Sequence, residues 1–323
     1  MATEAAPKTL REAILFFADY QNCRKAVEAI RWPDGVVRCP QCGSDRVTYL
    51  ASQRRYKCYG QHPKPQFSLK VGTIFEDSPL GFDKWLPALW LLTNCKNGIS
   101  SYELGRALGV TQKSAWFMLH RLRMALHDGD TTKFDGHVEA DETYIGGKAR
   151  NMHASKKRRV MMKRGRSIAG KVAVMALLDR HGKDGVSQVR TEVLSSLRKP
   201  HVQGHVRKHV SAGSKLSTDA FFSYQGLDGE YTHRVIDHAE AYVDGEVHTN
   251  NCENFWSLLK RAIRGTYVSV EPFHLFRYLD EQAFRFNKRA GDDAMRFITA
   301  LKGVLDKRLT YKVLIGSGVP QTC

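Results

Sequence analysis

The sequence predicts a mixed α/β protein, in which a larger domain follows a small metal-binding module and a group of helices. Three observations support this prediction. Three of the seven cysteines lie close together within residues 36–77, which are strand-like and rich in turns. Apolar side chains recur at helical spacing within residues 82–127. From residue 137 onward, strand-like segments come first and helical segments follow, with some interleaving.

Residues 1–35 are expected to contain a helix. Apolar side chains form a rough helical stripe over residues 8–31, and Trp32-Pro33-Asp34-Gly35 then breaks the pattern. The start of the chain carries no cleavable apolar run, and no stretch approaches the roughly 20 apolar residues that cross a bilayer. We therefore expect neither a secretory signal nor a membrane span.

The charge balance favours a polyanionic partner. The 323 residues include 50 Lys and Arg against 33 Asp and Glu, which gives a net charge of +17. Phosphate contacts and counterion release favour nucleic-acid binding by such a chain. A membrane surface is the other candidate, but no basic amphipathic anchor stands out.

Residues 36–80 predict a zinc-binding module. Cys39 and Cys42 form a Cys-x-x-Cys pair, whose thiolates can converge on one ion. Cys58 is the third expected ligand, and His62 is the natural fourth, with Cys95 as the alternative. Because four protein ligands close the coordination shell, we expect one structural zinc that stabilises a module too small to bury its own core.

Residues 81–130 predict a helix-turn-helix. Gly109 falls at the end of the first helix and Thr111 caps the second. The second helix would lie in a DNA groove. Its side chains expected to face DNA are Gln112, Lys113, Ser114, His120 and Arg121. A plain helical hairpin is the alternative interpretation of the same spacing.

Residues 131–290 predict the larger domain, and residues 291–323 a C-terminal tail. Strands are expected in residues 137–147, 170–180 and 187–194, a short strand passing into a helix in 215–227, and helices in 249–263 and 272–289. The middle of the first strand holds Asp141, the end of a later strand holds Asp219, and the first of these helices holds Glu253.

These three acids have the layout of a site for divalent metal ions. Phosphodiester chemistry on DNA needs carboxylates that converge from different parts of a fold. Lys260 lies seven positions after Glu253, close to two helical turns, so both lie on one helix face. Glu139 shares a strand face with Asp141 and is an alternative ligand, whereas Glu142 is expected on the opposite face.

A basic segment at residues 148–171 lies in a stretch without acids, between Tyr144 and Leu178. We expect this segment to clamp DNA near the three acids and to order only on binding. The residues predicted to contact DNA are Lys156, Lys157, Arg158, Arg159, Lys163 and Arg164.

The whole chain resembles the bacterial insertion-sequence transposases of the DDE class that carry an N-terminal zinc ribbon, the ISXO2-like transposase family. The resemblance covers roughly residues 30–290. The segments that carry it are Cys39–Cys42, FSLKVGTIFEDSPL at 67–80, ADETYIGGK at 140–148, Thr218-Asp219, and HTNNCENFWSLLKRAIRGTY at 248–267.

The resemblance implies an RNase H-like catalytic domain, with a mixed five-stranded sheet, and recognition of terminal inverted repeats. Asp141 and Asp219 match the first two catalytic acids. Members use either glutamate or asparagine as the third, so Glu253 has Asn250 as a rival. Where the family's ribbon often has a second Cys-x-x-Cys, this chain has Cys58-Tyr59-Gly60-Gln61-His62.

We therefore expect a DNA transposase that uses two Mg²⁺ (or Mn²⁺) ions, activating water for cleavage and then the freed 3′-OH for strand transfer. The expected partner is double-stranded DNA, namely terminal inverted repeats and target DNA, with a homodimer or larger assembly on it. The expected location is the bacterial cytoplasm, with nucleoid association when on DNA. The alternatives are a nuclease of the same fold, an inactive or domesticated transposase that only binds DNA, and a zinc-ribbon transcription or RNA-binding factor.

Overall fold

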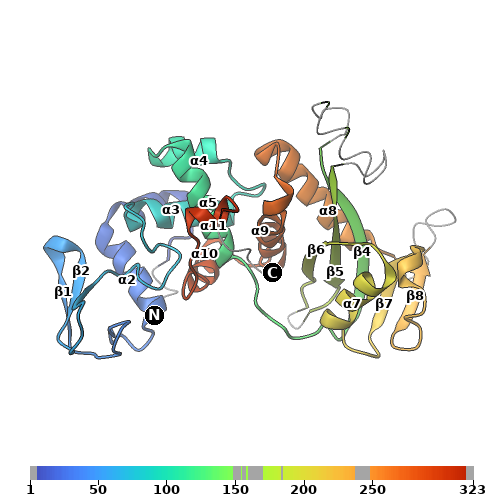
Figure 1. Ribbon diagram of the computed structural model, residues 1–323, viewed down its shortest axis with the longest axis horizontal. Helices are drawn as coiled ribbons and strands as arrows, with labels where there is room; N and C mark the ends of the chain where they lie inside the picture. The colour runs from blue at the N-terminus through green and yellow to red at the C-terminus, as the bar shows by residue number, and fades with distance from the viewer. Residues whose placement is uncertain are drawn as a thin grey trace. The chain divides into compact units, whose positions relative to one another are not determined.

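The computed structural model describes residues 6–147, 170–182, 185–236 and 248–317, together with the single positions 154 and 158. The chain divides into two compact units. The first unit combines residues 1–127 with residues 291–323, and the second comprises residues 128–290. Figure 1 labels most of the helices and strands of both units.

The first unit contains a small antiparallel sheet and a group of helices. Its strands are β1 (Val47–Leu50), β2 (Arg55–Cys58) and β3 (Gln66–Phe67), in the order β1-β2-β3. Its helices are α1 (Leu10–Ala18), α2 (Tyr20–Arg31), α3 (Phe82–Asn94), α4 (Ser101–Leu108), α5 (Gln112–Ala125), α10 (Asp293–Lys302) and α11 (Tyr311–Leu314), besides the short 3-10 turn η1 (Ala51–Gln53).

The N-terminal region, expected as one helix over residues 8–31, is two helices in the structure. α1 ends at Ala18, and the carboxylate of the next residue, Asp19, accepts a hydrogen bond from the Gln21 amide and so caps α2. An aspartate that bonds to the backbone two residues later favours a new helix start over continuation of the old one.

The segment expected as a C-terminal tail also forms helices. α10 packs against α3, and its Phe297 ring meets the Phe17 ring of α1 edge-on at 5.4 Å between centroids. The amide of Ile74 donates to the Val304 carbonyl. Residues 291–317 therefore pack into the core of the first unit.

The second unit is built on a mixed five-stranded sheet, as the family resemblance implies. Its strands are β4 (His137–Gly146), β5 (Lys171–Asp179), β6 (Gln188–Leu194), β7 (Lys215–Asp219) and β8 (Thr232–Ile236), in the order β6-β5-β4-β7-β8. β4 pairs antiparallel with β5 and parallel with β7. The change of direction therefore falls at the central strand, which carries Asp141.

Helices cover both faces of this sheet (Figure 1). They are α7 (Lys199–His209), α8 (Asn250–Ala262) and α9 (Leu275–Asn287), with the short turns η3 (Phe222–Tyr224), η4 (Ile263–Tyr267, a π-helix) and η5 (Pro272–His274). Val202 and Val206 of α7 enter one apolar cluster, and Phe255 and Leu259 of α8 enter the other.

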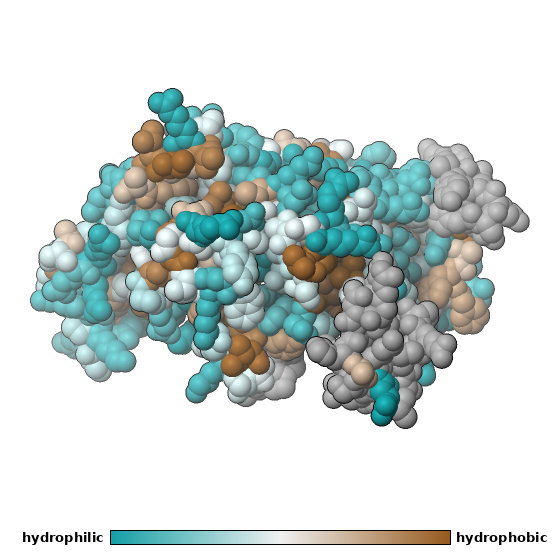
Figure 2. All heavy atoms as spheres, turned by 90° about the horizontal axis from the view of Figure 1, so that it is seen from above, coloured by the Kyte–Doolittle hydropathy of each residue, from teal (hydrophilic) through white to brown (hydrophobic). Residues whose placement is uncertain are grey.

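The strands expected in the second unit are present, as are the helices expected in residues 249–263 and 272–289, whereas α7 and β8 were not expected. The residues after β7 form only the 3-10 turn η3, where a helix was expected. Within the described residues, no helix combines the length and the apolar character that crossing a membrane requires. The face in Figure 2 is mostly hydrophilic, with small separate hydrophobic patches between the polar side chains.

Candidate active site

Two acids meet at the centre of the large sheet. Asp141 lies in the middle of β4, and Asp219 is the last residue of β7. The parallel register pairs Ala140 with Thr218, so the two acids occupy the next row on neighbouring strands, which lie about 4.8 Å apart. Asp219 also accepts a hydrogen bond from the Phe221 amide at 3.1 Å, which turns the chain out of the strand.

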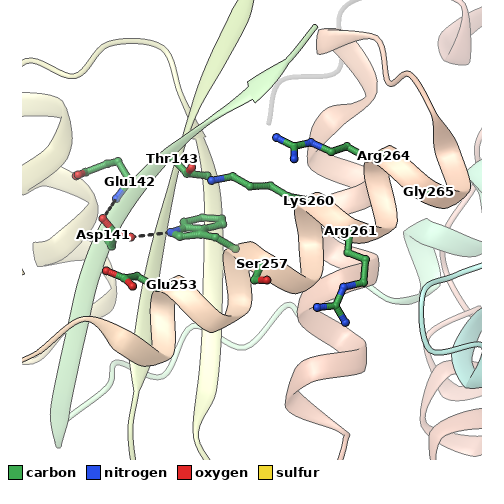
Figure 3. A pocket seen from close by; sticks show the side chains of 10 residues that line it. Asp141, Glu142, Thr143, Glu253, Ser257, Lys260, Arg261, Arg264 and Gly265 are labelled. Atoms are coloured by element: carbon green, nitrogen blue, oxygen red, sulfur yellow. Dashed lines mark hydrogen bonds between the residues drawn. The ribbon is translucent and has the colours of Figure 1, made fainter. Parts of the chain in front are cut away.

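Helix α8 brings Glu253 and Lys260 to the same place. Both residues line a pocket of about 820 Å³, and Figure 3 shows the carboxyl groups of Asp141 and Glu253 next to each other, with Lys260 extending toward Thr143. The full lining consists of Asp141, Glu142, Thr143, Glu253, Trp256, Ser257, Lys260, Arg261, Arg264 and Gly265. The predicted face shared by Glu253 and Lys260 is thus the face of α8 that meets the pocket.

The carboxyl group of Asp141 is held in place from two sides. Trp256 Nε1 donates to its Oδ2 at 2.9 Å, and the Glu142 amide donates to its Oδ1 at 2.9 Å. The pKa of Asp141 is raised to about 6, chiefly by burial and also by the charges of Asp219 and Glu253, while the hydrogen bonds from Trp256 and from the Glu142 amide lower it. A buried carboxyl group whose pKa is raised by two neighbouring carboxylates marks a site suited to a cation.

Glu142 is a fourth carboxyl group at this site. It points to the other face of β4, as the sequence predicts, where Tyr224 of η3 donates a hydrogen bond to its Oε1. Burial raises the pKa of Glu142 to about 8, and the charges of Asp219 and Asp141 act in the same direction. The tyrosine comes from a segment 82 positions away in the sequence.

The other side of the pocket is basic. Lys260, Arg261 and Arg264 follow one another along α8 and η4 and line the pocket together. Burial lowers the pKa of Lys260, while the charge of Asp141 opposes this change. An anionic substrate, such as a DNA phosphate, would find positive charge beside the carboxylates.

The start of α8 is fixed by Glu139, the alternative to Asp141 in the sequence analysis. This carboxylate is fully buried and accepts hydrogen bonds from the amides of Asn251 and Cys252 at 3.0 and 3.1 Å. Arg180 Nε donates to it at 2.7 Å, and Arg180 also donates to the carbonyl of His248 at 2.9 Å. Glu139 therefore anchors the helix N-terminus, where exposed amides attract negative charge.

The two candidates for the third acid differ in position. Glu253 lines the pocket and raises the pKa of Asp141 through its charge. Asn250 is the first residue of α8, one helical turn before Glu253 and on the same side of the helix; both residues are exposed, but Asn250 is not among the residues that line the pocket. The pocket geometry favours Glu253.

The four predicted zinc ligands come together in the first unit. The ligand atoms of Cys39, Cys42, Cys58 and His62 all lie within 4.8 Å of one another. Cys42 Sγ is 3.6 Å from Cys58 Sγ, and Cys39 Sγ is 3.4 Å from His62 Nε2. Zinc–sulfur bonds of about 2.3 Å in a tetrahedron place two sulfur atoms about 3.8 Å apart, so the donors fit zinc. Cys95, the alternative ligand, follows α3.

Gly60 makes room for this cluster. A Cβ atom at this position would lie 2.9 Å from Cys42 Sγ and 3.3 Å from Cys58 Sγ. The Gly60 amide donates to Cys58 Sγ at 3.2 Å, as backbone amides do to thiolates. The sequence Cys58-Tyr59-Gly60-Gln61-His62 therefore departs from a second Cys-x-x-Cys but still closes a four-ligand set.

The two helices around Gly109 have the expected ends. Gly109 is in the left-handed region at φ 64°, and Thr111 caps α5 by accepting a hydrogen bond from the Ser114 amide at 3.2 Å. Gln112 and Lys113 are exposed and Ser114 is half-buried. These three side chains stand at the start of α5, where they are accessible.

Arg121 and His120 are buried, which corrects the expectation that they face DNA. Arg121 is 4% exposed, and its guanidinium lies over the Trp85 and Phe117 rings. It donates a hydrogen bond to the Glu76 carbonyl. A guanidinium committed to the core of the first unit is not available to a base or a phosphate.

The basic segment lies mostly outside the described residues. Of its predicted DNA contacts, Arg158 is described and exposed, and the others lie outside the described residues: Lys156, Lys157, Arg159, Lys163 and Arg164.

Some residues of the pocket were not expected from the sequence. Arg264 and Arg261 could have been found from the helical spacing that links Glu253 to Lys260, because positions three or four apart share a face. Trp256 is buried and donates a hydrogen bond to Asp141. The partnership of Glu142 with Tyr224 leaves no local signal in the sequence.

Two family models match the chain. One, described as an ISXO2-like transposase domain, matches residues 133–287, and the other, a transposase zinc-ribbon domain, matches residues 19–60. The first match contains all three acids, and the second contains three of the four zinc-cluster residues. A relative from Halobacterium salinarum, described as an uncharacterized protein in transposable element ISH50, is 28% identical over an alignment of 296 residues that covers 87% of this chain and 96% of the relative.

Proposed function

We propose that this chain, which a model of the ISXO2-like transposase domain matches over residues 133–287 and a model of the transposase zinc ribbon matches over residues 19–60, cuts DNA at transposon ends and joins the freed ends to target DNA. The observation that carries this proposal is the pocket in which Asp141 and Glu253 face the basic side chains of Lys260, Arg261 and Arg264. Asp219 completes the acid set, because its charge acts on Asp141.

The acids suit two Mg²⁺ or Mn²⁺ ions. Oxygen ligands are those that Mg²⁺ prefers, and carboxylates crowded together gain most from a cation between them. Asp141, Asp219 and Glu253 would hold these ions, which supply an activated nucleophile and stabilise the leaving oxygen of a phosphodiester. Trp256 and the Glu142 amide keep Asp141 oriented for that task.

The basic residues of α8 and η4 would position the DNA. Lys260 and Arg264 lie beside the acids and can pair with phosphates flanking the scissile bond. The ion pair of Glu139 with Arg180 holds the N-terminus of α8, and so sets the place of Glu253 relative to Asp141. The five-stranded order β6-β5-β4-β7-β8 supports an RNase H-like architecture for this unit.

The first unit would recognise DNA. α4 and α5 would act as a helix-turn-helix that reads the terminal inverted repeats, with Gln112, Lys113 and Ser114 at the base edges. The cluster of Cys39, Cys42, Cys58 and His62 would hold one structural zinc. Since two transposon ends must be joined together, the protein would act as a homodimer or larger assembly on DNA.

Replacement of Asp219 by Ala tests the proposal. The variant should lose Mg²⁺-dependent cleavage of transposon-end DNA and strand transfer, because one metal ligand is missing, while still binding end DNA. Asp135→Ala, which removes an exposed aspartate outside the pocket, is the matched control and should cleave like the parent. Cleavage by Asp219→Ala at the parental rate would refute the assignment, and cleavage without strand transfer by the parent would indicate a nuclease.

A further inference from the structure

A second cluster of metal-type ligands lies on the large sheet, away from the three acids. It consists of Glu192 on β6 and of His205 and His209 on α7. The ligand atoms of all three residues lie within 4.8 Å of one another. From these contacts we propose that Glu192, His205 and His209 form a binding site for a divalent transition metal of the zinc class.

The local geometry explains why the three side chains meet. His205 and His209 are four positions apart on α7, so their imidazoles lie above one another on one helix face. Glu192 lies opposite Met175 in the sheet, on the face that α7 covers through Val202 and Val206. A strand therefore supplies the carboxylate, and one face of the covering helix supplies both imidazoles.

The distances suit one small ion. His205 Nδ1 lies 2.6 Å and His209 Nε2 lies 3.6 Å from the same oxygen, Glu192 Oε2. Bonds of about 2.0–2.1 Å in a tetrahedron place such donors about 3.4 Å apart, between the two observed values. His205 Nδ1 is buried and faces Glu192 Oε2 at 2.6 Å, so a metal ion would take the place of a proton between these two atoms.

The donor set and its exposure suit zinc more than magnesium. Two imidazoles and one carboxylate are ligands that Zn²⁺ uses when it keeps a fourth position for water, whereas Mg²⁺ prefers oxygen. The side chains are 19–38% exposed, so an ion can enter and retain water. Lys208, whose Nζ is 3.7 Å from Glu192 Oε2, is 62% exposed and can turn into solvent when the ion binds.

The site would fasten α7 to the sheet beside the candidate active site. β6 is an edge strand, and the register aligns Glu192 with Met175 and, one strand further, with Glu142. Two strand spacings of about 4.8 Å separate the backbones of Glu192 and Glu142. A metal bound here would thus stabilise the part of the sheet in which Glu192, Met175 and Glu142 lie side by side on neighbouring strands.

Zinc counting on the full-length protein tests this site. The protein is loaded with Zn²⁺ in the presence of excess Mg²⁺, freed of unbound metal by gel filtration and analysed by plasma emission. We expect two zinc ions per parent chain, one in the Cys39–His62 cluster and one here, and a single ion in His209→Ala. His201→Ala is the matched control, since it removes an exposed histidine one turn before His205, and it should keep both ions.

Asp219→Ala, measured in the same way, detects zinc held by the three acids, and it should also keep two ions. One zinc in the folded parent, or two in His209→Ala, would overturn the proposal. A readout that needs no variant guards against misfolding. Addition of Zn²⁺ should shift the imidazole nitrogen resonances of His205 and His209 in the parent, and resonances that do not move would equally reject the site.

Discussion

A single substitution can test directly whether the carboxyl group of Glu253 is the third metal ligand. Glu253→Gln keeps the size of the side chain but removes the charge that faces Asp141 in the pocket. We expect Mg²⁺-dependent cleavage to fall by ~100-fold or more, because even the loss of a group that only hydrogen-bonds to a metal ligand lowers activity by ~10–100-fold. Cleavage rates at saturating Mg²⁺ measure this effect.

Asn250→Ala is the counterpart of that experiment, because Asn250 is the rival for the third ligand. It lies one turn earlier on α8 and is exposed. We expect its cleavage rate to stay within about tenfold of the parent. If Asn250→Ala is inactive while Glu253→Gln cleaves normally, the third ligand is Asn250.

Glu142 gives the metal-free protein a distinctive pH dependence. Its pKa is raised from 4.5 to about 8, so the folded state binds its proton more tightly than the unfolded state does. This proton stabilises the fold fully below pH ~4.5, and the contribution is lost as the pH rises toward 8. Without Mg²⁺, we expect the free energy of unfolding to fall between pH 5 and pH 8.

Urea denaturation at a series of pH values measures this change. Glu142→Gln removes the titrating proton and should flatten the profile over that range, although the shift of Asp141 to about 6 leaves a smaller slope. Glu103→Gln, a change at an exposed capping residue, should leave the slope between pH 5 and pH 8 unchanged. A parental slope in Glu142→Gln would show that another group titrates.

Among the elements, helix α8 depends on one buried ion pair. Glu139 is fully buried, and it bonds both to Arg180 and to two amides at the start of the helix. Loss of one partner of a buried pair costs ~3–5 kcal/mol, because the other charge is left uncompensated. We expect Glu139→Ala to lower the free energy of unfolding by about this amount and to lower cleavage, since α8 carries Glu253.

Glu230→Ala is the matched control for that change. Glu230 pairs with Arg207 at 2.7 Å, but both side chains are more than 40% exposed. Exposed pairs contribute little to stability because solvent screens them, so this variant should be nearly as stable as the parent. Equal losses in the two variants would contradict the anchoring role of Glu139.

The zinc cluster depends on Gly60, which lies between the ligands Cys58 and His62. In Gly60→Ala, the new Cβ would come within 2.9 Å of Cys42 Sγ, so the sulfur or the loop must move. We expect zinc affinity to fall roughly 10-fold or more, measured by competition with a chelator. Gly129→Ala adds the same methyl group where no atom lies within 4 Å and should bind zinc like the parent.

The elements also show what the sequence could predict. The pair Cys39 and Cys42, and the helical spacing from Glu253 to Lys260, are local patterns that survive in any fold containing them, and both groupings are found in the structure. α7 has only two buried apolar residues, Val202 and Val206, and β8 is five residues long, so neither produces a strong periodic signal.

Contacts between distant segments could not be predicted in this way. Glu139 and Asp141 share a strand face, so periodicity cannot tell which of them is the metal ligand. In the structure, Glu139 bonds to the N-terminus of α8 and to Arg180. Arg121 has the position and charge of a DNA contact, yet α5 turns it into the core against Trp85. In both cases packing of one element on another decides the role.

At the level of the whole molecule, the net charge of +17 must coexist with a site made of acids. In the proposed function, Asp141, Asp219 and Glu253 would repel phosphates until metal ions neutralised their charges. Basic residues elsewhere therefore have to supply the attraction, and those on α8 and in residues 148–171 are the candidates. Binding driven in this way releases counterions and depends steeply on salt.

The salt dependence of DNA binding tests which residues provide that attraction. Each phosphate contact contributes about 0.9 to the slope of log affinity against log salt concentration. Replacing residues 156–159 (Lys-Lys-Arg-Arg) by alanine should lower the slope by up to ~4, if all four contact phosphate. Fluorescence anisotropy with duplex DNA, between ~50 and ~200 mM salt, measures it.

A control of equal charge makes the result specific. It replaces four exposed basic residues of the first unit by alanine: Lys8, Arg11, Lys25 and Lys302. Both quadruple variants carry +13 instead of +17, since each loses four positive charges. If net charge alone attracts DNA, the two slopes fall equally. If residues 156–159 contact phosphate, only their variant changes, and the effect should persist on DNA without terminal repeats, because phosphate contacts carry no sequence information.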